Sequence, residues 1–303
     1  MNSMKPVYKA VIPVAGLGTR MLPATKAIPK ELLPIYDRPI IEHVVKEAIN
    51  CGIREIILVT RSGKESIENH FDAHYELEHR LVKKGENKIL EDIVKVVPDT
   101  IKISSIRQAD ALGLGHAILC ARHMINDEPF AVLLPDVLVL DKKNRDKSFS
   151  FAHLVGAWNE TGLGQVMVEE VDFSKIEKYG IIDIAENNIN LFDSTPIINI
   201  IEKPSVQNAP SNLAVLGRYV LPPEVLDILE NISPGVGGEI QLTDALLKLQ
   251  IKEGLNAVMT DASIFDCGNK LGYLSANLAV GMQDPKSRAS IIALFDKLTN
   301  DTI

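Results

Sequence analysis

The chain has 303 residues, of which 46% are hydrophobic and 24% charged, a composition typical of a globular protein with a sizeable core. Its formal net charge of −8 argues against general nucleic-acid binding, which needs a basic face, but it leaves room for an anionic small molecule held by local Lys and Arg. No apolar run is long enough to span a bilayer, and residues 1–9 lack the pattern of a secretory signal, so we expect a cytoplasmic protein with no membrane partner. The three cysteines are far apart and predict neither a disulfide framework nor a zinc site.

The first half of the chain alternates between apolar runs typical of buried strands and segments with helical spacing. The predicted strands cover residues 9–15, 55–60, 101–106 and 130–134, and the predicted helices cover residues 40–50, 64–71 and 114–124. Such close alternation predicts an α/β fold with a mainly parallel, Rossmann-like sheet flanked by helices. Ligands of these sheets bind at the carboxyl ends of the strands, where the glycines after Ala15 and the carboxylate of Asp136 are expected.

The second half has shorter connections, which favour antiparallel pairing and make the whole sheet mixed. Its predicted strands cover residues 165–170, 180–184, 197–201 and 213–220, and its predicted helices cover residues 239–252 and 270–282. No linker rich in Gly, Pro or Ser divides the chain, and no internal repeat occurs. We therefore expect residues 1–303 to form one structural unit with a C-terminal helical extension.

The most informative segment is AGLGTRMLPATKAIPKELLP, residues 15–34. Its glycines let the backbone approach a ligand closely, and exposed N–H groups in such a turn cradle phosphate oxygens. Arg20 and Lys30 then supply positive charge to a polyphosphate. A lone G-x-G is otherwise an ordinary surface turn, and this one fails as a dinucleotide fingerprint because Met21 replaces the third glycine. Residues 58–65 faintly resemble a P-loop but lack its first glycine and its Ser or Thr.

The pattern G-x-G-T-R, followed by P-x-T and P-K-E-L-L-P, resembles the signature of the sugar-1-phosphate nucleotidyltransferases, and its wording is most similar to their uridylyltransferase branch. Further matching motifs are ENHFD at 68–72, GLGH at 113–116, LPD at 134–136, EKP at 202–204, EIQLTD at 239–244 and DCGNKLGY at 266–273. The resemblance covers residues 9–281. It implies the nucleotide-diphospho-sugar transferase fold, with a nucleotide-binding half at 9–140, a sugar-binding half at 141–282 and a helical tail at 283–303. It also implies a homo-oligomer, either a dimer or a tetramer.

The resemblance further implies a role for each matching residue. Arg20 is expected to grip the departing pyrophosphate, and Lys30 to neutralise charge on the α-phosphate. The nucleotide is expected to contact Ala15, Gly16, Gly18, Thr19, Glu31, Gln108 and Gly113. The sugar phosphate is expected to contact Gly180, Glu202 and Lys203. Asp136 and Asp266 are expected to bind Mg²⁺, which prefers carboxylate oxygens, although a lone aspartate at a strand end is more often a turn residue or a cap.

The implied reaction joins UTP to glucose 1-phosphate and yields UDP-glucose and pyrophosphate. The attacking phosphate is already anionic, so no strong general base is needed. Accordingly, His70 and His74 are interpreted as a solvated helix face, and His116 and His123 as structural residues. A related thymidylyltransferase acting on the same sugar phosphate is the nearest alternative. A non-catalytic regulatory paralogue and a purely structural protein are others, but such paralogues tend to lose the Thr-Arg pair, which is present here as Thr19 and Arg20.

Overall fold

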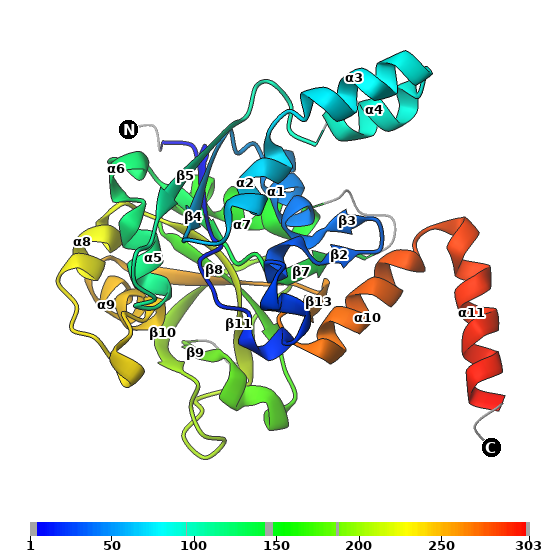
Figure 1. The fold of residues 1–303 in the computed structure, drawn as a ribbon. Helices are drawn as coiled ribbons and strands as arrows, with labels where there is room; N and C mark the ends of the chain where they lie inside the picture. The colour runs from blue at the N-terminus through cyan, green and yellow to red at the C-terminus, as the bar shows by residue number, and fades with distance from the viewer. Residues whose placement is uncertain (1–4, 95, 143–147, 186–187, 301–303) are drawn as a thin grey trace.

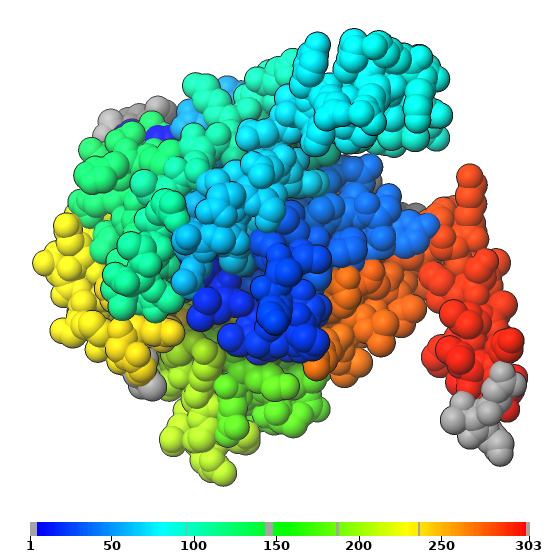
Figure 2. All heavy atoms as spheres, viewed as in Figure 1, coloured from blue at the N-terminus to red at the C-terminus, as the bar shows by residue number. Residues whose placement is uncertain are grey.

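The computed structural model describes residues 5–94, 96–142, 148–185 and 188–300. A central sheet runs through the body with helices on both faces, and two helical extensions leave it, as Figure 1 shows. One is the hairpin of α3 (Tyr75–Lys84) and α4 (Asn87–Val94), and the other is the arm of α10 (Lys270–Gly281) and α11 (Pro285–Asn300). Figure 2 shows α11 standing away from the globular body. No helix in the described part of the chain is long and apolar enough to cross a membrane.

One side of the nine-stranded sheet comes from the first half of the chain and is entirely parallel, in the order β5-β4-β1-β6. These strands are β1 (Lys9–Pro13), β4 (Glu55–Thr60), β5 (Lys102–Arg107) and β6 (Phe130–Leu133). The connecting helices are α1 (Ile40–Asn50), α2 (Glu65–Phe71), α5 (Leu114–Cys120) and α6 (Arg122–Ile125). The predicted single helix over 114–124 is wrong, because the helix ends at Ala121 and α6 starts anew.

The other side continues in the order β11-β8-β12-β10-β9 and is mostly antiparallel. Its strands are β8 (Gly164–Glu170), β9 (Gly180–Ile184), β10 (Ser194–Glu202), β11 (Leu213–Leu221) and β12 (Leu255–Met259). Of the strand pairs in this sheet, β1–β4, β1–β6, β4–β5 and β8–β12 are parallel, whereas β6–β11, β8–β11, β9–β11, β9–β10 and β10–β12 are antiparallel. The α/β class and the mixed pairing are confirmed, but the expectation of a mainly parallel sheet holds only for the first half.

Alternate residues of each central strand point to opposite faces, and each face has its own core. Val11 and Ile57 pack in the core that also contains α5, α8 (Glu224–Glu230) and α9 (Leu242–Glu253). Ile12 and Leu58 pack in the other core, with α1, α2 and α7 (Phe149–Thr161). The unbroken apolar runs of β1 and β4 are therefore needed to fill both cores at once. The predicted helix over 239–252 begins instead at Leu242.

Smaller elements shape the edge at which the strands of the first half end. They are the ribbon of β7 (Val137–Leu140) with β13 (Ser263–Asp266), the ribbon of β2 (Pro34–Ile35) with β3 (Arg38–Pro39), and five 3-10 turns. These turns are η1 (Thr19–Met21), η2 (Ala24–Lys26), η3 (Lys30–Leu32), η4 (Phe173–Lys178) and η5 (Val236–Gly238).

The two histidines predicted to lie on one solvated helix face do not share a helix. Helix α2 ends at Phe71, and His74 instead accepts a hydrogen bond from the backbone N–H of Leu77 as the N-cap of α3. His70 is half-buried, and its Nε2 lies 3.3 Å from Oε2 of Glu42. The expectation of a solvated pair is therefore wrong for His70, because α1 supplies a carboxylate partner.

Candidate active site

The glycine loop turns sharply after β1 and is packed against its own continuation. Gly18 adopts a left-handed φ of 67°, and its carbonyl oxygen accepts a 2.7 Å hydrogen bond from the hydroxyl of Thr25. A Cβ on Gly18 would lie 3.4 Å from both Thr25 and Lys30, and one on Gly16 would lie 3.6 Å from Cε of Lys30. The loop thus lies directly over the Lys30 side chain; glycine is favoured at position 18 by its left-handed φ, whereas a Cβ on Gly16 would make only an ordinary contact.

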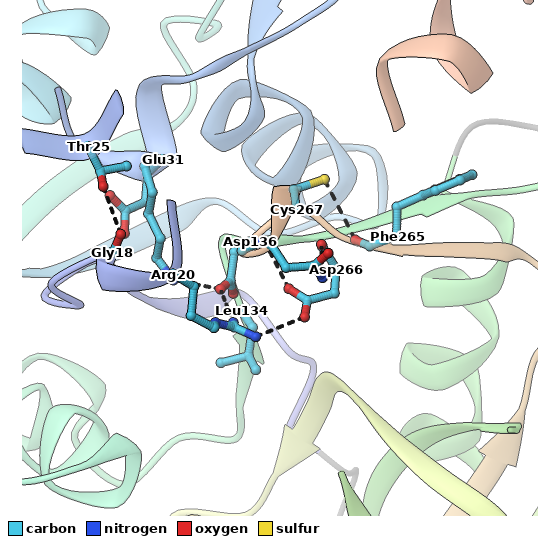
Figure 3. A network of polar contacts seen from close by, with 12 residues as sticks. Gly18, Arg20, Thr25, Glu31, Leu134, Asp136, Phe265, Asp266 and Cys267 are labelled. Atoms are coloured by element: carbon cyan, nitrogen blue, oxygen red, sulfur yellow. Dashed lines mark hydrogen bonds and ion pairs between the residues drawn. The ribbon is translucent and has the colours of Figure 1, made fainter. Parts of the chain in front are cut away.

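Four charged side chains meet at the end of this loop. Nζ of Lys30 lies 2.5 Å from Oδ2 of Asp136, and Nη1 of Arg20 lies 3.0 Å from Oδ2 of Asp266. A second Arg20 nitrogen, Nη2, is 3.7 Å from the Asp136 carboxylate. Figure 3 shows the Arg20 side chain extending toward both aspartates. We call these four residues, Arg20, Lys30, Asp136 and Asp266, the charged cluster.

Pairing of β7 with β13 brings the two aspartates together from positions far apart in the chain. Asp266 stands opposite Val137 in this ribbon, and the backbone N–H of Cys267 donates a 2.8 Å hydrogen bond to the carbonyl oxygen of Asp136. A Cβ built on Gly268 would lie 2.6 Å from Oδ2 of Asp136 and 2.9 Å from Oδ1 of Asp266. Both carboxylates thus approach one point, and a side chain at position 268 would intrude on it.

The electrostatics of the charged cluster keep its buried members ionised. Burial alone would raise the pKa of the Asp136 carboxyl, but Lys30 and then Arg20 lower it below its usual range. Burial alone would lower the pKa of Lys30, but the Asp136 carboxylate raises it above its usual range. A carboxylate and an ammonium group, each able to interact with a charged ligand, are therefore both present at neutral pH.

The charged cluster opens into a cleft of about 770 Å³. Of the residues predicted from the sequence, those lining it are Thr19, Arg20, Asp136, Gly180, Glu202, Lys203 and Asp266. Tyr179, Glu239, Gln241 and Thr243 also line it, and sequence reasoning assigned none of these a role. The remaining predicted residues are not among those that line the cleft: Ala15, Gly16, Gly18, Lys30, Glu31, Gln108 and Gly113. The structure therefore brings residues from both halves of the chain to one cavity.

The far wall of the cleft is built where β9 pairs with β10. Gly180 stands opposite Glu202 in this pair, and a Cβ on Gly180 would lie 3.0 Å from Thr243 and 3.3 Å from Oε2 of Glu202. Thr243 donates a 3.0 Å hydrogen bond to the same oxygen. Lys203, whose Nζ lies 3.2 Å from Glu202, has a left-handed φ of 44°, and its backbone N–H donates to the carbonyl of Tyr179. A lysine held in this conformation stores strain, as is often found at ligand sites.

Gln108 and Gly113 are neighbours, as their spacing predicted. The side-chain amide nitrogen of Gln108 donates to the Gly113 carbonyl at 3.1 Å and lies 2.9 Å from Nδ1 of His116. A carbonyl can only accept, so the amide nitrogen must face it, and the second amide proton then points to His116. Both amide protons of Gln108 are thereby directed at groups within the protein. Gly113 has a φ of 98°, and a Cβ there would lie 2.9 Å from Glu239, a lining residue of the cleft.

Glu31 and Lys64 form a buried ion pair beside the glycine loop. Glu31 is 0% exposed, and its Oε2 accepts a 2.6 Å hydrogen bond from Nζ of Lys64, which is 7% exposed. Burial raises the pKa of Glu31 above its usual range, although Lys64 opposes the shift. Among the described residues, the other carboxylate oxygen of Glu31 has no hydrogen-bond partner. Lys64 belongs to the segment that failed as a P-loop, so sequence reasoning gave it no role.

Comparison with known proteins identifies the family. The sequence model of the nucleotidyl transferase family matches residues 9–283. The chain belongs to the nucleotidyl transferase family. The expected span of the resemblance, residues 9–281, is thereby confirmed.

Individual relatives are similar over almost their whole length. A UTP–glucose-1-phosphate uridylyltransferase of Haemophilus influenzae is 48% identical over 278 residues, which cover 92% of this chain and 94% of the relative. The structure of a UTP-bound UGPase from Acinetobacter baumannii matches with a TM-score of 0.88 at 45% identity, covering 96% of this chain and 99% of that one. A UDP-glucose pyrophosphorylase complexed with UDP-glucose matches with a TM-score of 0.80 at 36% identity, covering 92% of this chain and 100% of that one.

Proposed function

We propose that this protein transfers the uridylyl group of UTP to glucose 1-phosphate, forming UDP-glucose and pyrophosphate. The observation that carries the proposal is the charged cluster, in which two cations and two carboxylates from distant parts of the chain meet at one cleft. The names of the relatives, which include a uridylyltransferase, a UTP complex and a UDP-glucose complex, support the same substrates.

The two carboxylates of the charged cluster fit a Mg²⁺ ion. Asp136 and Asp266 both bring hard oxygen donors close to Gly268, where a Cβ on that glycine would lie 2.6 and 2.9 Å from the two carboxylates. In the described part of the chain no group of three or more His, Cys, Asp or Glu side chains could hold a metal, so the remaining ligands would be phosphate oxygens and water. When bound, the ion would neutralise charge on the phosphates and help to orient them.

The cations of the charged cluster have a matching role. Arg20 and Lys30 are each paired with an aspartate of the cluster. With nucleotide and metal present, the aspartates would face the metal, and the two cations would be free to turn to phosphate oxygens. Lys30, which the carboxylate keeps protonated, would neutralise the α-phosphate, and Arg20, which is 60% exposed, would follow the departing pyrophosphate. Catalysis would then be mostly positioning and charge stabilisation.

The proposed reaction needs no base from the protein. A phosphate oxygen of glucose 1-phosphate forms a bond to the α-phosphorus of UTP, and the bond from that phosphorus to the bridging oxygen of the β-phosphate breaks. The attacking oxygen is already ionised, and pyrophosphate leaves with the electron pair of the broken bond. Glu202 and Lys203, which both line the cleft, would hold the sugar hydroxyls and the sugar phosphate, respectively.

Base selection would follow from the orientation of Gln108. With its amide protons directed at Gly113 and His116, the side chain offers an acceptor, which suits the N3–H of uracil or thymine. Cytosine has no hydrogen at N3 and would be rejected. An apolar wall meeting one thymine methyl discriminates by only about 10–200-fold, so weak use of dTTP is compatible with the proposal.

We assign residues 9–140 to the nucleotide-binding half, residues 141–282 to the sugar-binding half, and residues 283–303 to the C-terminal tail, in which α11 is helical up to Asn300 and residues 301–303 lie outside the described part of the chain. The cytoplasmic location and the homo-oligomeric state stay predictions. In support of catalysis over the regulatory alternative, the Thr19-Arg20 pair is present and lines the cleft.

The test is pyrophosphate release from UTP, dTTP or CTP in the presence of glucose 1-phosphate and Mg²⁺, with and without EDTA. We expect rapid release with UTP, slower release with dTTP, none with CTP, and loss of all release on adding EDTA. A preference for dTTP would move the protein to the thymidylyltransferase branch. No release with any nucleotide would contradict the proposal and favour the regulatory paralogue.

A further inference from the structure

Arg218 is a fully buried charged residue near the cleft, and the proposed reaction does not use it. It is 0% exposed, and all five of its N–H groups have acceptors. Nε and Nη2 donate to the two carboxylate oxygens of Glu47 at 2.9 and 2.7 Å. The other three donate to backbone carbonyls of Leu134, Val137 and Gly217 at 3.1, 2.7 and 3.2 Å.

A bulge in β11 aims this side chain. The register of β11 against β8 shifts between Val215 and Tyr219, and within that stretch Gly217 has a φ of 70°. A Cβ on Gly217 would lie 2.6 Å from the Leu134 side chain, so only glycine fits where β11 passes the end of β6. Bulges next to active sites commonly redirect a side chain, and here the redirected residue is Arg218.

Two of the carbonyls that Arg218 holds flank Asp136. Leu134 and Val137 bracket the turn that carries this aspartate, and the N–H of Leu134 in turn donates to the carbonyl of Gly217 at 2.9 Å. The carbonyl of Asp136 itself accepts from Cys267. The backbone of the turn is thus fixed on both sides, whereas Glu47, 8% exposed on α1, balances the buried charge.

We propose that Arg218, with Glu47 as its counter-ion, is a positioning residue for the Asp136 turn. It holds the turn so that the Asp136 carboxylate faces the common point with Asp266 before any ligand arrives. The inference deepens the proposed function and rests on it, because it assigns to Asp136 the metal role described there.

A purely stabilising role would also explain a buried cation that binds carbonyls, and Lys9 provides the internal comparison. Lys9 is 6% exposed, its Nζ donates to the carbonyls of Met124 and Ile125, and it lies 3.1 Å from Glu128. It is likewise a buried cation on a central strand, but it stands at the start of β1, at the opposite end of that strand from the glycine loop. Lys9→Met is therefore a matched control, because it removes a buried cation that donates to backbone carbonyls without touching the Asp136 turn.

The experiment compares the wild type with Arg218→Lys, with the charge-free double variant Arg218→Met/Glu47→Leu, and with Lys9→Met. The primary readout is Mn²⁺ binding by the protein in the presence of saturating UTP, measured from the rise in water proton relaxation when protein is added, which separates Mn²⁺ held by the protein from Mn²⁺ held by free UTP. The secondary readouts are thermal unfolding and the KM for glucose 1-phosphate. Lysine has three donors where arginine has five, so Arg218→Lys cannot hold Glu47 and all three carbonyls. The double variant covers the case in which Arg218→Lys fails to fold, because it leaves no buried charge unpaired.

We expect Arg218→Lys and the double variant to weaken Mn²⁺ binding by about tenfold or more, the usual scale for losing a residue that orients a metal ligand. Lys9→Met should leave Mn²⁺ binding unchanged at a similar loss of Tm, and the KM for glucose 1-phosphate should stay unchanged in all variants. Equal weakening by Lys9→Met, or wild-type Mn²⁺ binding in a folded double variant, would overturn the inference, and so would a wild type that binds no Mn²⁺ with UTP. A wild type that binds Mn²⁺ and UTP but makes no UDP-glucose would overturn the proposed function, and the Mn²⁺ comparison would still decide the role of Arg218.

Discussion

The two ends of the cleft differ in how firmly their charged residues are held. At the nucleotide end, the side chains of Lys30 and Asp136 are each 15% exposed and 2.5 Å apart. At the sugar end, Lys203 is 58% exposed and Glu202 is 27% exposed, with 3.2 Å between their charged atoms. Behind the nucleotide end lie two fully buried ion pairs, Lys64 with Glu31 and Arg218 with Glu47, and behind the sugar end a single threonine supports Glu202.

This difference matches the chemistry proposed for each end. Stabilising charge that develops at a reacting phosphorus requires donors that do not have to reorganise, so the groups around the α-phosphate gain from being fixed in advance. Binding a sugar phosphate requires only that a cation and a carboxylate close around it, which exposed residues can do. If the proposed assignment of the two ends holds, we expect the nucleotide end to be prebuilt and the sugar end to be completed by its ligand.

The largest loss of stability is expected from removing one partner of the buried ion pair between Lys64 and Glu31. Lys64→Met would leave Glu31 buried without its partner, which costs about 3–5 kcal/mol of unfolding free energy. Urea unfolding measures the loss. The double variant Lys64→Met/Glu31→Leu should recover most of it, because no unpaired charge remains. A single variant as stable as the wild type would show that this pair does not hold the nucleotide end.

Removing the exposed cation of the charged cluster should affect turnover and leave stability nearly unchanged. Arg20 is 60% exposed, so Arg20→Ala is expected to fold normally, while kcat falls by about 10²–10³, the scale for losing one charge-stabilising donor. Steady-state kinetics and thermal unfolding together measure this. Near-normal kcat would remove Arg20 from the proposed chemistry.

At the sugar end we expect a smaller effect, confined to the KM of one substrate. Lys203→Ala should raise the KM for glucose 1-phosphate by about tenfold and leave the KM for UTP unchanged, since an exposed charge contributes about 1 kcal/mol or slightly more. Lys178, which also lines the cleft, provides the control as Lys178→Ala, with a smaller rise expected. Equal changes in both KM values would contradict the separation of the two ends.

The smallest effect concerns Glu42 on α1, a paired carboxylate away from the residues that line the cleft. Burial alone would raise its pKa, but the neighbouring His70, together with hydrogen bonds from Lys46 and Arg38, lowers it to about 2. The folded pKa lies below that of an unfolded glutamate, about 4.3, so its stabilisation is complete above that pH and is lost as the pH falls toward 2. Glu42→Gln should cost about 1 kcal/mol at pH 7.

Urea unfolding at pH 7 and pH 3 checks the sign of this effect. The difference in unfolding free energy between wild type and Glu42→Gln should shrink at pH 3. A difference that grows at low pH would contradict the assigned direction. Because Glu42 is paired yet remote from the reaction, kcat should not change in this variant, in contrast to Arg20→Ala.

The members of the charged cluster could be predicted from the sequence because they lie in linear motifs that resemble those of the nucleotidyltransferases, and Asp136 and Asp266 also stand at strand ends, where α/β sheets bind ligands. The sequence did not predict Arg218, Glu47 or Lys64, because their partners come from other elements and no local spacing marks them. One signal was available, since Arg218 stands inside the apolar run LAVLGRYVL, and a charge in a buried strand requires a specific set of partners.

The fold was predictable to a similar extent. Strands β1, β4 and β6 are unbroken apolar runs, whereas α3 and α4 bury no residue and left no core-facing pattern to read. The balance of parallel and antiparallel pairs depended on long-range pairing of β11 with β6, β8 and β9, which no local pattern encodes.

The central claim is that the nucleotide end of the cleft is formed before its ligand binds, and that the sugar end is not. Isothermal titration calorimetry of each substrate into the free protein with Mg²⁺ tests it most directly. UTP should bind to the protein alone. Glucose 1-phosphate should bind only weakly alone and much more tightly once a UTP analogue that cannot release pyrophosphate fills the nucleotide end. Tight binding of glucose 1-phosphate to the free protein, with UTP binding only afterwards, would contradict the account.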